Sequence, residues 1–68
     1  MSVMNTIELE GVSAESWGEA AREALREASR TIRAINRLEV LGTATTVDGG
    51  RITEYRTQVR LYFTVEGT

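Results

Sequence analysis

Apolar and polar residues alternate over residues 3–10, which is the pattern of a β-strand with one buried face. Ile7 and Leu9 fall on one side of such a strand. The other side carries the polar residues Thr6, Glu8 and Glu10. The segment Gly11-Val12-Ser13 comes next, and a glycine followed closely by a serine indicates that the strand has ended. We therefore expect a first strand over residues 3–10.

A helical period replaces this alternation after Ser16. Ser16 and Glu19 have the spacing of a capping box, in which a serine caps the first turn and a glutamate follows three residues later. The apolar side chains beyond the cap share an arc of about 140° at the helical period, and they are Trp17, Ala20, Ala21, Ala24, Leu25, Ala28, Thr31, Ile32 and Ile35. The pattern predicts a helix to about Ile35, whose alanines let it lie close to a sheet. We expect Trp17 to pack on Val12 or on the sheet.

Charged residues occupy the opposite face of this helix. Glutamates recur at every fourth position, as Glu15, Glu19, Glu23 and Glu27. Arginines stand three residues after three of them, as Arg22, Arg26 and Arg30. Opposite charges at this spacing pair on a helix surface. We expect this face to be solvated, with contact to a neighbouring subunit as the alternative.

Two long strands joined by a tight turn form the C-terminal half. We place them over residues 37–47 and 51–65, and both exceed the usual length of about five or six residues. Asp48-Gly49-Gly50 lies between them. Glycines suit a hairpin turn because its central residues need positive φ. The pattern predicts a long β-hairpin.

A two-residue turn at Gly49-Gly50 decides which residues of the hairpin face each other. On the side under the helix, it pairs Leu38 with Leu61 and Val40 with Val59, beside Tyr55 and Phe63. On the other side, it pairs Arg37 with Tyr62, Glu39 with Arg60, Leu41 with Gln58 and Thr43 with Arg56. Because side chains alternate between the faces of a strand, we expect an apolar face under the helix and an arginine-rich polar face opposite.

The size of the chain favours assembly with copies of itself. The 68 residues are enough for one domain, which we take to be residues 1–68. One helix covers only about half of so long a sheet, and a domain this small usually needs a disulfide, a metal or oligomerisation. The chain has no cysteine and no histidine, so neither a disulfide nor a zinc cluster is available. Oligomerisation is the remaining way to stabilise a domain of this size.

Charge and hydropathy exclude several classes of protein. A net charge of −2 is too balanced to indicate nucleic-acid binding. No apolar run approaches the ~20 residues of a membrane span, and no N-terminal stretch has the pattern of a signal peptide. We therefore expect a cytoplasmic protein. All eight basic residues are arginine, which suits fixed or stacked contacts; a bias in genomic composition is the alternative explanation.

Catalysis is not indicated by any arrangement of residues. The chain lacks histidine and cysteine, and Ser13 and Ser16 have no adjacent base and suit helix caps. The helix glutamates, with Glu8 and Glu10, lack a loop of the alternating oxygen ligands that calcium prefers. We expect no enzyme activity, and we assign no catalytic and no metal-binding residue.

The order of these elements resembles the dodecin family over nearly the whole chain. The matching features are Glu8, Gly11-Val12-Ser13, the helix ending Thr31-Ile32-Arg33, Glu39-Val40, Asp48-Gly49, and the run Tyr55-Arg56-Thr57-Gln58-Val59 that leads to Phe63. The resemblance implies an α+β subunit of β-α-β-β order, with a three-stranded antiparallel sheet partly wrapped around one helix. It also implies a hollow homo-dodecamer. Dodecins that bind flavin hold it as a stacked pair at subunit contacts, and they store it without catalysis.

Two positions carry flavin recognition in that family, and both hold arginine here. The tryptophan that stacks on the flavin ring corresponds to Arg37. The glutamine that bonds to the ring edge corresponds to Arg56, and Gln58 on the same face is its substitute. The resemblance therefore implies a ligand site at Arg37, Arg56 and Gln58, for FMN, riboflavin or a similar planar ligand. Arginine at these positions favours an anionic group such as a phosphate.

A flavin-free cage of the same fold is the alternative. In it, Glu39 pairs with Arg60, while Glu8 or Glu54 pairs with the remaining arginines. Such a network would neutralise the polar face and fix the assembly. A cage of this kind would also be able to bind metal ions such as calcium, as some flavin-poor relatives of the dodecins do.

Overall fold

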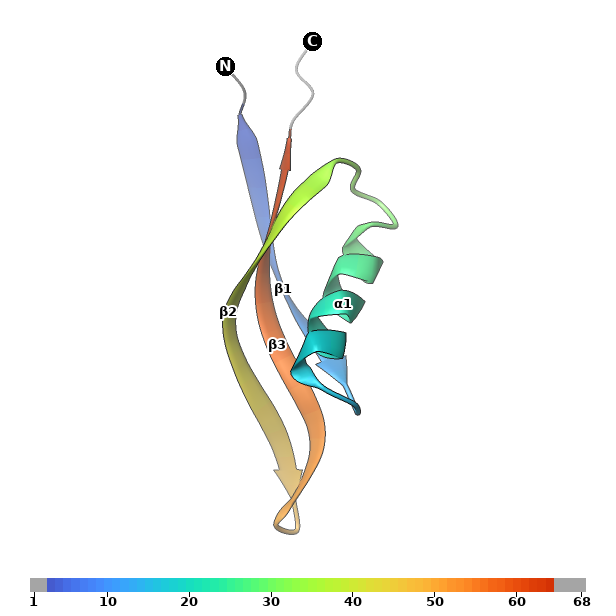
Figure 1. Cartoon of the computed structure of the whole chain (residues 1–68), viewed down its shortest axis with the longest axis vertical. Coiled ribbons are helices and arrows are strands. Elements are labelled where there is room, and N and C mark those ends of the chain that lie inside the picture. Colours follow the sequence, from blue (N-terminus) through green and yellow to red (C-terminus); the bar gives the residue numbers. More distant parts are fainter. Residues whose placement is uncertain (1–2, 65–68) are drawn as a thin grey trace.

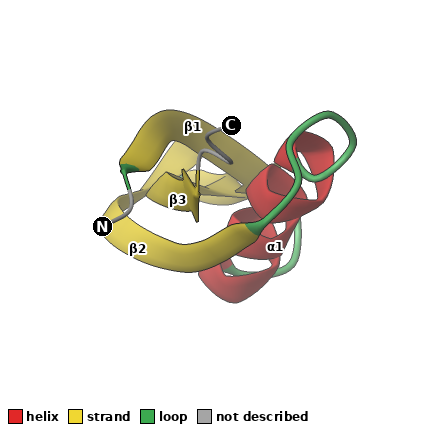
Figure 2. Cartoon of the chain, turned by 90° about the horizontal axis from the view of Figure 1, so that it is seen from above, coloured by secondary structure: helices red, strands yellow, loops and turns green. Residues whose placement is uncertain are grey.

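The chain folds into a three-stranded antiparallel sheet with a helix against one face (Figure 1, Figure 2). The structure, a computed structural model, describes residues 3–64. The elements follow in the order β1 (Met4–Ser13), α1 (Trp17–Ala28), β2 (Ile35–Asp48) and β3 (Arg51–Thr64). β3 lies in the middle of the sheet, between β1 and β2. The predicted α+β fold of β-α-β-β order is confirmed.

The helix begins at the predicted serine cap. The Ser16 hydroxyl oxygen accepts a hydrogen bond of 3.0 Å from the backbone N–H of Glu19. In a full capping box the Glu19 side chain would accept from the backbone N–H of Ser16. Here that N–H donates to the Ser13 hydroxyl at 3.4 Å instead. The Glu19 carboxylate instead lies 3.8 Å from Arg22. The predicted pairs Glu23–Arg26 and Glu27–Arg30 also form, on the exposed face.

The helix ends at Ala28, so the prediction that it runs to about Ile35 is wrong. Ser29 caps its C-terminus, and Ala34 takes a φ of 63°, in the left-handed region. This turn reverses the chain so that Ile35 begins β2 and pairs with Phe63. Ile35 still packs against the core, which explains why it fits the helical period without being helical.

The first strand is longer than predicted, because Gly11-Val12-Ser13 belongs to β1 and does not end it. Gly11 is buried beneath the helix. A Cβ at this position would lie 1.7 Å from the backbone oxygen of Ala20. The glycine therefore marks the close approach of α1 to the sheet.

The hairpin turns at Gly49 and Gly50, whose φ values of 58° and 77° both need the freedom of glycine. The predicted strand limits were 37–47 and 51–65, whereas β2 spans Ile35–Asp48 and β3 spans Arg51–Thr64. The predicted end of the third strand, Val65, lies outside the described residues.

The predicted register is right at one end of the hairpin and wrong in its middle. Four predicted pairs are confirmed, and they are Arg37–Tyr62, Leu38–Leu61, Glu39–Arg60 and Val40–Val59. Leu41 then bulges from β2, so Gln58 pairs with Gly42 and not with Leu41. Arg56 likewise pairs with Ala44 and not with Thr43. A second bulge, at Thr53 of β3, restores the predicted register beside the turn.

The core lies between the helix and the middle part of the sheet in Figure 1. Ala24, Ala28, Val59 and Leu61 are buried together, and Ile7, Leu9 and Leu38 pack against them. The helix packs mainly on β1 and β3 and scarcely on β2. Val40, expected under the helix, is therefore 54% exposed. Val47 and Ile52 are exposed as well, in the part of the hairpin that extends past α1 in Figure 1.

Candidate functional site

The face of the sheet turned away from the helix carries the predicted polar site. Along β3, Thr57, Val59 and Leu61 are buried beneath α1, at 1%, 0% and 0% exposure. Because side chains alternate along a strand, the residues between and beside them lie on the opposite face, and these are Arg56, Gln58, Arg60 and Tyr62. We call this side of the sheet the outer face.

Arg56 ties the three strands together on the outer face. Its Nη1 donates to Glu10 of β1 at 2.8 Å, and its Nη2 donates to Glu54 of β3 at 3.0 Å. Its Nε donates to the Thr46 hydroxyl of β2 at 2.8 Å. The hydrogen bonds to Glu10 and then to Glu54 raise the pKa of Arg56 above its ordinary value. All three nitrogens of this guanidinium are therefore used within the chain.

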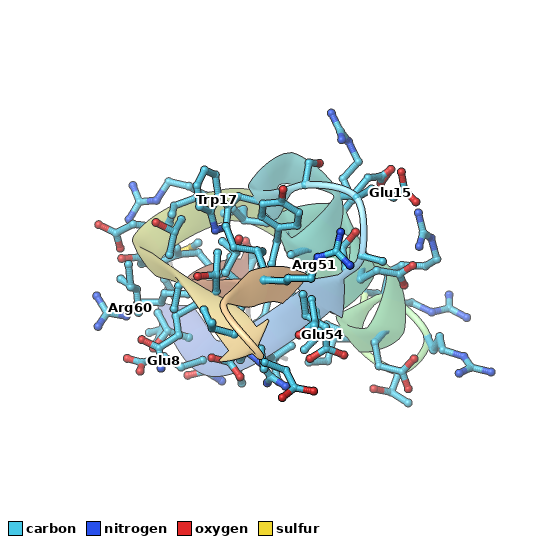
Figure 3. All side chains as sticks on the ribbon, turned by 90° about the horizontal axis from the view of Figure 1, so that it is seen from below. Glu8, Glu15, Trp17, Arg51, Glu54 and Arg60 are labelled. Carbon is cyan, nitrogen blue, oxygen red and sulfur yellow. The ribbon has the colours of Figure 1, made fainter. Side chains whose placement is uncertain are left out.

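Arg60 makes a second clamp of the same kind. Its Nε and Nη2 donate to one oxygen of Glu8 at 3.2 and 2.8 Å, and Figure 3 shows Glu8 and Arg60 side by side. Its Nη1 donates to Glu39 Oε1 at 3.4 Å. The hydrogen bond to Glu8 is the main reason why the pKa of Arg60 is raised. Of the predicted network, the pair Glu39–Arg60 and a pair between Glu54 and a remaining arginine, Arg56, are present within one chain, whereas Glu8 pairs with Arg60.

Arg37 has a different environment. Its guanidinium carbon lies 3.8 Å from the centroid of the Tyr62 ring, which is a cation–π contact. Within residues 3–64, no carboxylate lies within ion-pair distance of Arg37, and its side chain makes no hydrogen bond. The neighbouring carboxylate of Glu39 accepts instead from the Tyr62 hydroxyl at 2.7 Å. Arg37 is therefore exposed, lies over the Tyr62 ring, and leaves its N–H donors unused within residues 3–64.

Gln58 lies between two shallow hollows of the outer face. One has a volume of about 260 Å³ and is lined by Glu10, Gly42, Thr43, Ala44, Arg56 and Gln58. The other, of about 280 Å³, is lined by Glu8, Leu9, Glu10, Leu41 and Gln58. The bulge at Leu41 sets Gly42 opposite Gln58, where nothing occupies the space that a Cβ would take. Within residues 3–64 the Gln58 amide has no hydrogen-bond partner, so it is available to a ligand.

The three predicted site residues share a face but do not form a single pocket in one chain. Arg56 and Gln58 line the same hollow. Arg37 stands across from Tyr62, four residues further along β3 than Gln58, which is about 13 Å at the rise of a β-strand. Sequence reasoning did not give Glu10 or Tyr62 a role at the site. The predicted pairing of Arg37 with Tyr62 was the signal that could have identified the stacked pair.

Trp17 lies on the other side of the sheet and packs there as predicted. Its indole N–H donates to the Ala44 carbonyl of β2 at 3.0 Å. Its ring meets the ring of Tyr55 edge-on, at 5.3 Å and 86°. The backbone carbonyl of Trp17 also accepts from the buried Thr57 hydroxyl at 2.8 Å. These contacts give Trp17 a structural role in fastening the start of the helix to β2 and β3.

Two features that are absent from residues 3–64 limit the type of site. Over residues 3–64, no group of three or more histidine, cysteine or acidic side chains is arranged to hold a metal ion. Over the same residues, no helix has the length and hydropathy to cross a membrane. A hollow of about 410 Å³ lies on the helix side, and its lining residues are Ile7, Leu9, Glu27, Ala28, Arg30, Thr31 and Ile32.

Comparisons with known proteins point to one family. The family model Dodecin matches residues 3–66. No curated protein matches the chain. An arginine-to-alanine variant of the T. thermophilus dodecin is 30% identical and superposes with a TM-score of 0.92, over 98% of this chain and 100% of that one.

Two other solved structures have the same fold. The calcium dodecin of Mycobacterium tuberculosis, described as a calcium-chelating antigen with a novel calcium-binding site, is 31% identical, with a TM-score of 0.84 over 98% of this chain and 96% of that one. The dodecin from Streptomyces coelicolor is 24% identical, with a TM-score of 0.93 over 98% and 96% of the two chains. The similarity to the Streptomyces coelicolor protein shows a shared fold alone.

Proposed function

The chain belongs to the dodecin family, and from this membership we propose that it is a non-catalytic protein that binds and stores a planar anionic small molecule. FMN or riboflavin is the ligand that the family resemblance favours. Arg37, Arg56 and Gln58 form the site, at contacts between subunits of a homo-dodecamer. Arg37 stands where flavin-binding dodecins have their stacking tryptophan.

The stacked pair of Arg37 and Tyr62 is the observation that carries this proposal. The guanidinium lies over the tyrosine ring at 3.8 Å and is exposed. A guanidinium plane stacks on aromatic rings, and its N–H groups match a phosphate with two parallel hydrogen bonds. Gln58 adds an amide for the edge of a ring, in a hollow that the glycine at position 42 leaves open.

The separation of these residues supports a site between subunits. Arg37 and Arg56 are about 20 Å apart along the sheet, since Arg37 pairs with Tyr62, and Tyr62 is six residues from Arg56 on β3. A flavin-sized ligand that contacts both an Arg37 and an Arg56 must therefore lie between two copies of the chain. The exposed apolar residues of the hairpin, Val40 and Val47 among them, supply the surface for such contacts.

A flavin titration tests the proposal. The absorption spectrum of the purified protein reports on flavin that is already bound, and FMN is then added while its fluorescence is followed. We expect quenching at micromolar protein, and absence of quenching would rule out a flavin ligand. Sedimentation gives the mass, and the mass of a monomer would remove the dodecamer.

Replacing Arg37 with tryptophan is a second test of the same site. An indole at this position offers a larger ring for stacking, worth about 1–3 kcal/mol for each base-like ring. We expect Arg37→Trp to create or strengthen flavin binding. Unchanged affinity would mean that this position does not correspond to the stacking tryptophan of the family.

A flavin-free cage is the second candidate, and the two arginine clamps favour it. Arg56 and Arg60 each bond to two carboxylates, so the positive charge of these two arginines is compensated without a ligand. A relative of 31% identity is described as a calcium dodecin. Calcium titration by calorimetry, in parallel with FMN, distinguishes the candidates, because heat with calcium and none with FMN supports the cage.

A further inference from the structure

Three arginines lie on the outer face, and their hydrogen bonds divide them into two classes. We infer that Arg37 alone among them binds the phosphate of a ligand, that Tyr62 and Glu39 position it for this, and that Arg56 is structural. The inference rests on the proposed function, and it assigns different roles to two arginines that the family resemblance treats alike.

The donors of each guanidinium support this division. An arginine has five N–H donors in a fixed planar fork. Every side-chain nitrogen of Arg56 already donates, to Glu10, Glu54 and Thr46. Two N–H groups of Arg56 remain, but a phosphate bound to them would lie beside the carboxylates of Glu10 and Glu54, whose negative charges repel it. Arg56 is therefore a poor anion site, although it lines the hollow next to Gln58.

Arg60 is excluded for the same reason. All three of its nitrogens donate, two to Glu8 and one to Glu39. Arg37 makes no such bond within residues 3–64, and its guanidinium lies over the face of the Tyr62 ring. A ring face attracts the cation but takes none of its N–H groups, which lie in the guanidinium plane. The edge of the Arg37 fork therefore stays available for two parallel bonds to a phosphate.

The geometry around Glu39 explains why Arg37 remains available. Glu39 is two residues from Arg37 on β2 and points to the same face, so it is the nearest natural partner for this cation. Its Oε1 instead accepts from the Tyr62 hydroxyl at 2.7 Å and from Arg60 Nη1 at 3.4 Å. Tyr62 thus has two functions, because its ring supports Arg37 and its hydroxyl holds the competing carboxylate away.

The inference predicts selectivity for a phosphate monoester over a neutral ligand with the same ring. FMN and riboflavin share the isoalloxazine ring and differ by a phosphate, so their two dissociation constants isolate its contribution. Charge-assisted hydrogen bonds at a partly exposed site correspond to about tenfold tighter binding. We expect wild-type protein to bind FMN about tenfold more tightly than riboflavin at constant ionic strength.

Two matched variants separate the roles of the arginines. Arg37→Gln removes the charge of the unused arginine, and we expect the FMN preference to disappear without a change in melting temperature. Arg56→Gln removes one clamp, and we expect a lower melting temperature while the ratio of the two dissociation constants is kept. The reverse pattern, with selectivity lost in Arg56→Gln and kept in Arg37→Gln, overturns the assignment.

A rescue experiment tests the positioning roles. Tyr62→Phe keeps the ring but removes the hydroxyl, so Glu39 becomes able to pair with Arg37 and compete with the phosphate. We expect FMN affinity to fall severalfold while riboflavin affinity is unchanged. Adding Glu39→Gln to Tyr62→Phe should restore the FMN preference, which a purely structural role for Tyr62 would not produce. A double variant as weak as Tyr62→Phe refutes the positioning mechanism.

A protein that binds no flavin can be distinguished from one in which Arg37 is not the anion site. If neither flavin binds, the proposed function is wrong, and inorganic phosphate then serves as the probe. Phosphate should raise the melting temperature of wild-type protein more than that of Arg37→Gln, with chloride at matched ionic strength as the control. Equal shifts in the two proteins would overturn the assignment of Arg37 as the anion site.

Discussion

The two faces of β3 are held by different kinds of interaction. Under the helix, Thr57, Val59 and Leu61 are almost completely buried, and the helix lies against the glycine at position 11. On the outer face, Arg56 and Arg60 keep about a third of their side-chain surface exposed and pair with carboxylates, at 35% exposure each. Burial and close packing dominate folding energetics, whereas exposed ion pairs contribute little. The difference indicates that the covered face determines stability and leaves the outer face free to serve function.

The largest effect should come from adding one methyl group beneath the helix. Gly11→Ala places a Cβ 1.7 Å from the Ala20 carbonyl oxygen, which belongs to the backbone and has little room to move. The helix must lift from the sheet, and we expect the free energy of unfolding to fall by about 3 kcal/mol, the upper part of the range for overpacking. Chemical denaturation measures this loss.

Gly42→Ala is the matched control for that substitution. A Cβ at Gly42 has nothing within 4 Å, on a strand that the helix scarcely touches. We expect a change within about 0.5 kcal/mol, as for an ordinary surface position. Similar losses in both glycine variants would show that the contrast between the two faces is wrong.

Truncating a core leucine should have an effect of comparable or slightly smaller size. Leu61 is 0% exposed, and Leu61→Ala should cost about 2–3 kcal/mol in unfolding free energy, the lower part of the range for truncating a buried leucine. Leu41 is 40% exposed at the bulge, so Leu41→Ala should cost much less in the same urea titration. If Leu41→Ala were as destabilising, another surface of the folded protein would have to cover this leucine.

The turn between α1 and β2 offers a stabilising change. Ala34 takes a φ of 63° where the chain leaves the helix for β2, and a left-handed conformation costs a residue with a Cβ about 1–2 kcal/mol. Ala34→Gly removes this cost but gives the unfolded chain more freedom. We expect a net gain of about 0.5–1 kcal/mol, seen as a higher melting temperature. A lower melting temperature would mean that the turn depends on the alanine methyl group.

The smallest effect concerns alkaline pH. Hydrogen bonds to Glu10 and Glu54 raise the pKa of Arg56 above its ordinary value. A pKa raised by folding gives stability that is fully present below the ordinary value and is lost only as the pH rises through the raised value. The difference in urea midpoint between wild-type protein and Arg56→Gln should therefore be small and equal at about pH 7 and about pH 10. If the two proteins had the same urea midpoint near pH 10 but not near pH 7, the pairing of Arg56 with Glu10 and Glu54 would be contradicted.

The sequence predicts the order of elements and the two faces, because these depend on alternation and on a glycine turn. It does not predict the end of the helix, since Ile35 packs on the core from a strand and therefore continues the helical period by position alone. The register is right from Arg37 to Val40, wrong between the bulges at Leu41 and Thr53, and right again beside the turn, because the two bulges compensate each other. The sequence offers one signal of the first bulge, which is the adjacent apolar pair Val40-Leu41 in a strand that otherwise alternates.

For the candidate site, the sequence predicts which residues face outward but not how their hydrogen bonds are distributed. The pairing of Arg37 with Tyr62 and of Glu39 with Arg60 follows from the turn, and both pairs are present. That Glu10 reaches Arg56 depends on β1 lying beside β3, and no local pattern encodes this order of strands. Long-range pairing of this kind decides which arginine is bonded to carboxylates. The distinction between Arg37 and Arg56 therefore emerges only in three dimensions.

The tryptophan at the start of the helix makes the protein its own optical reporter. Trp17 is the only tryptophan of the chain, so indole emission comes from a single known place. Its ring N–H is bonded to the carbonyl of Ala44 and its edge meets Tyr55, and each contact joins the helix to a different strand of the hairpin. Detachment of the hairpin from the helix breaks both contacts at once and increases the exposure of Trp17, which is 45% in the folded protein. The wavelength of one fluorophore therefore records the docking of these two parts without any label.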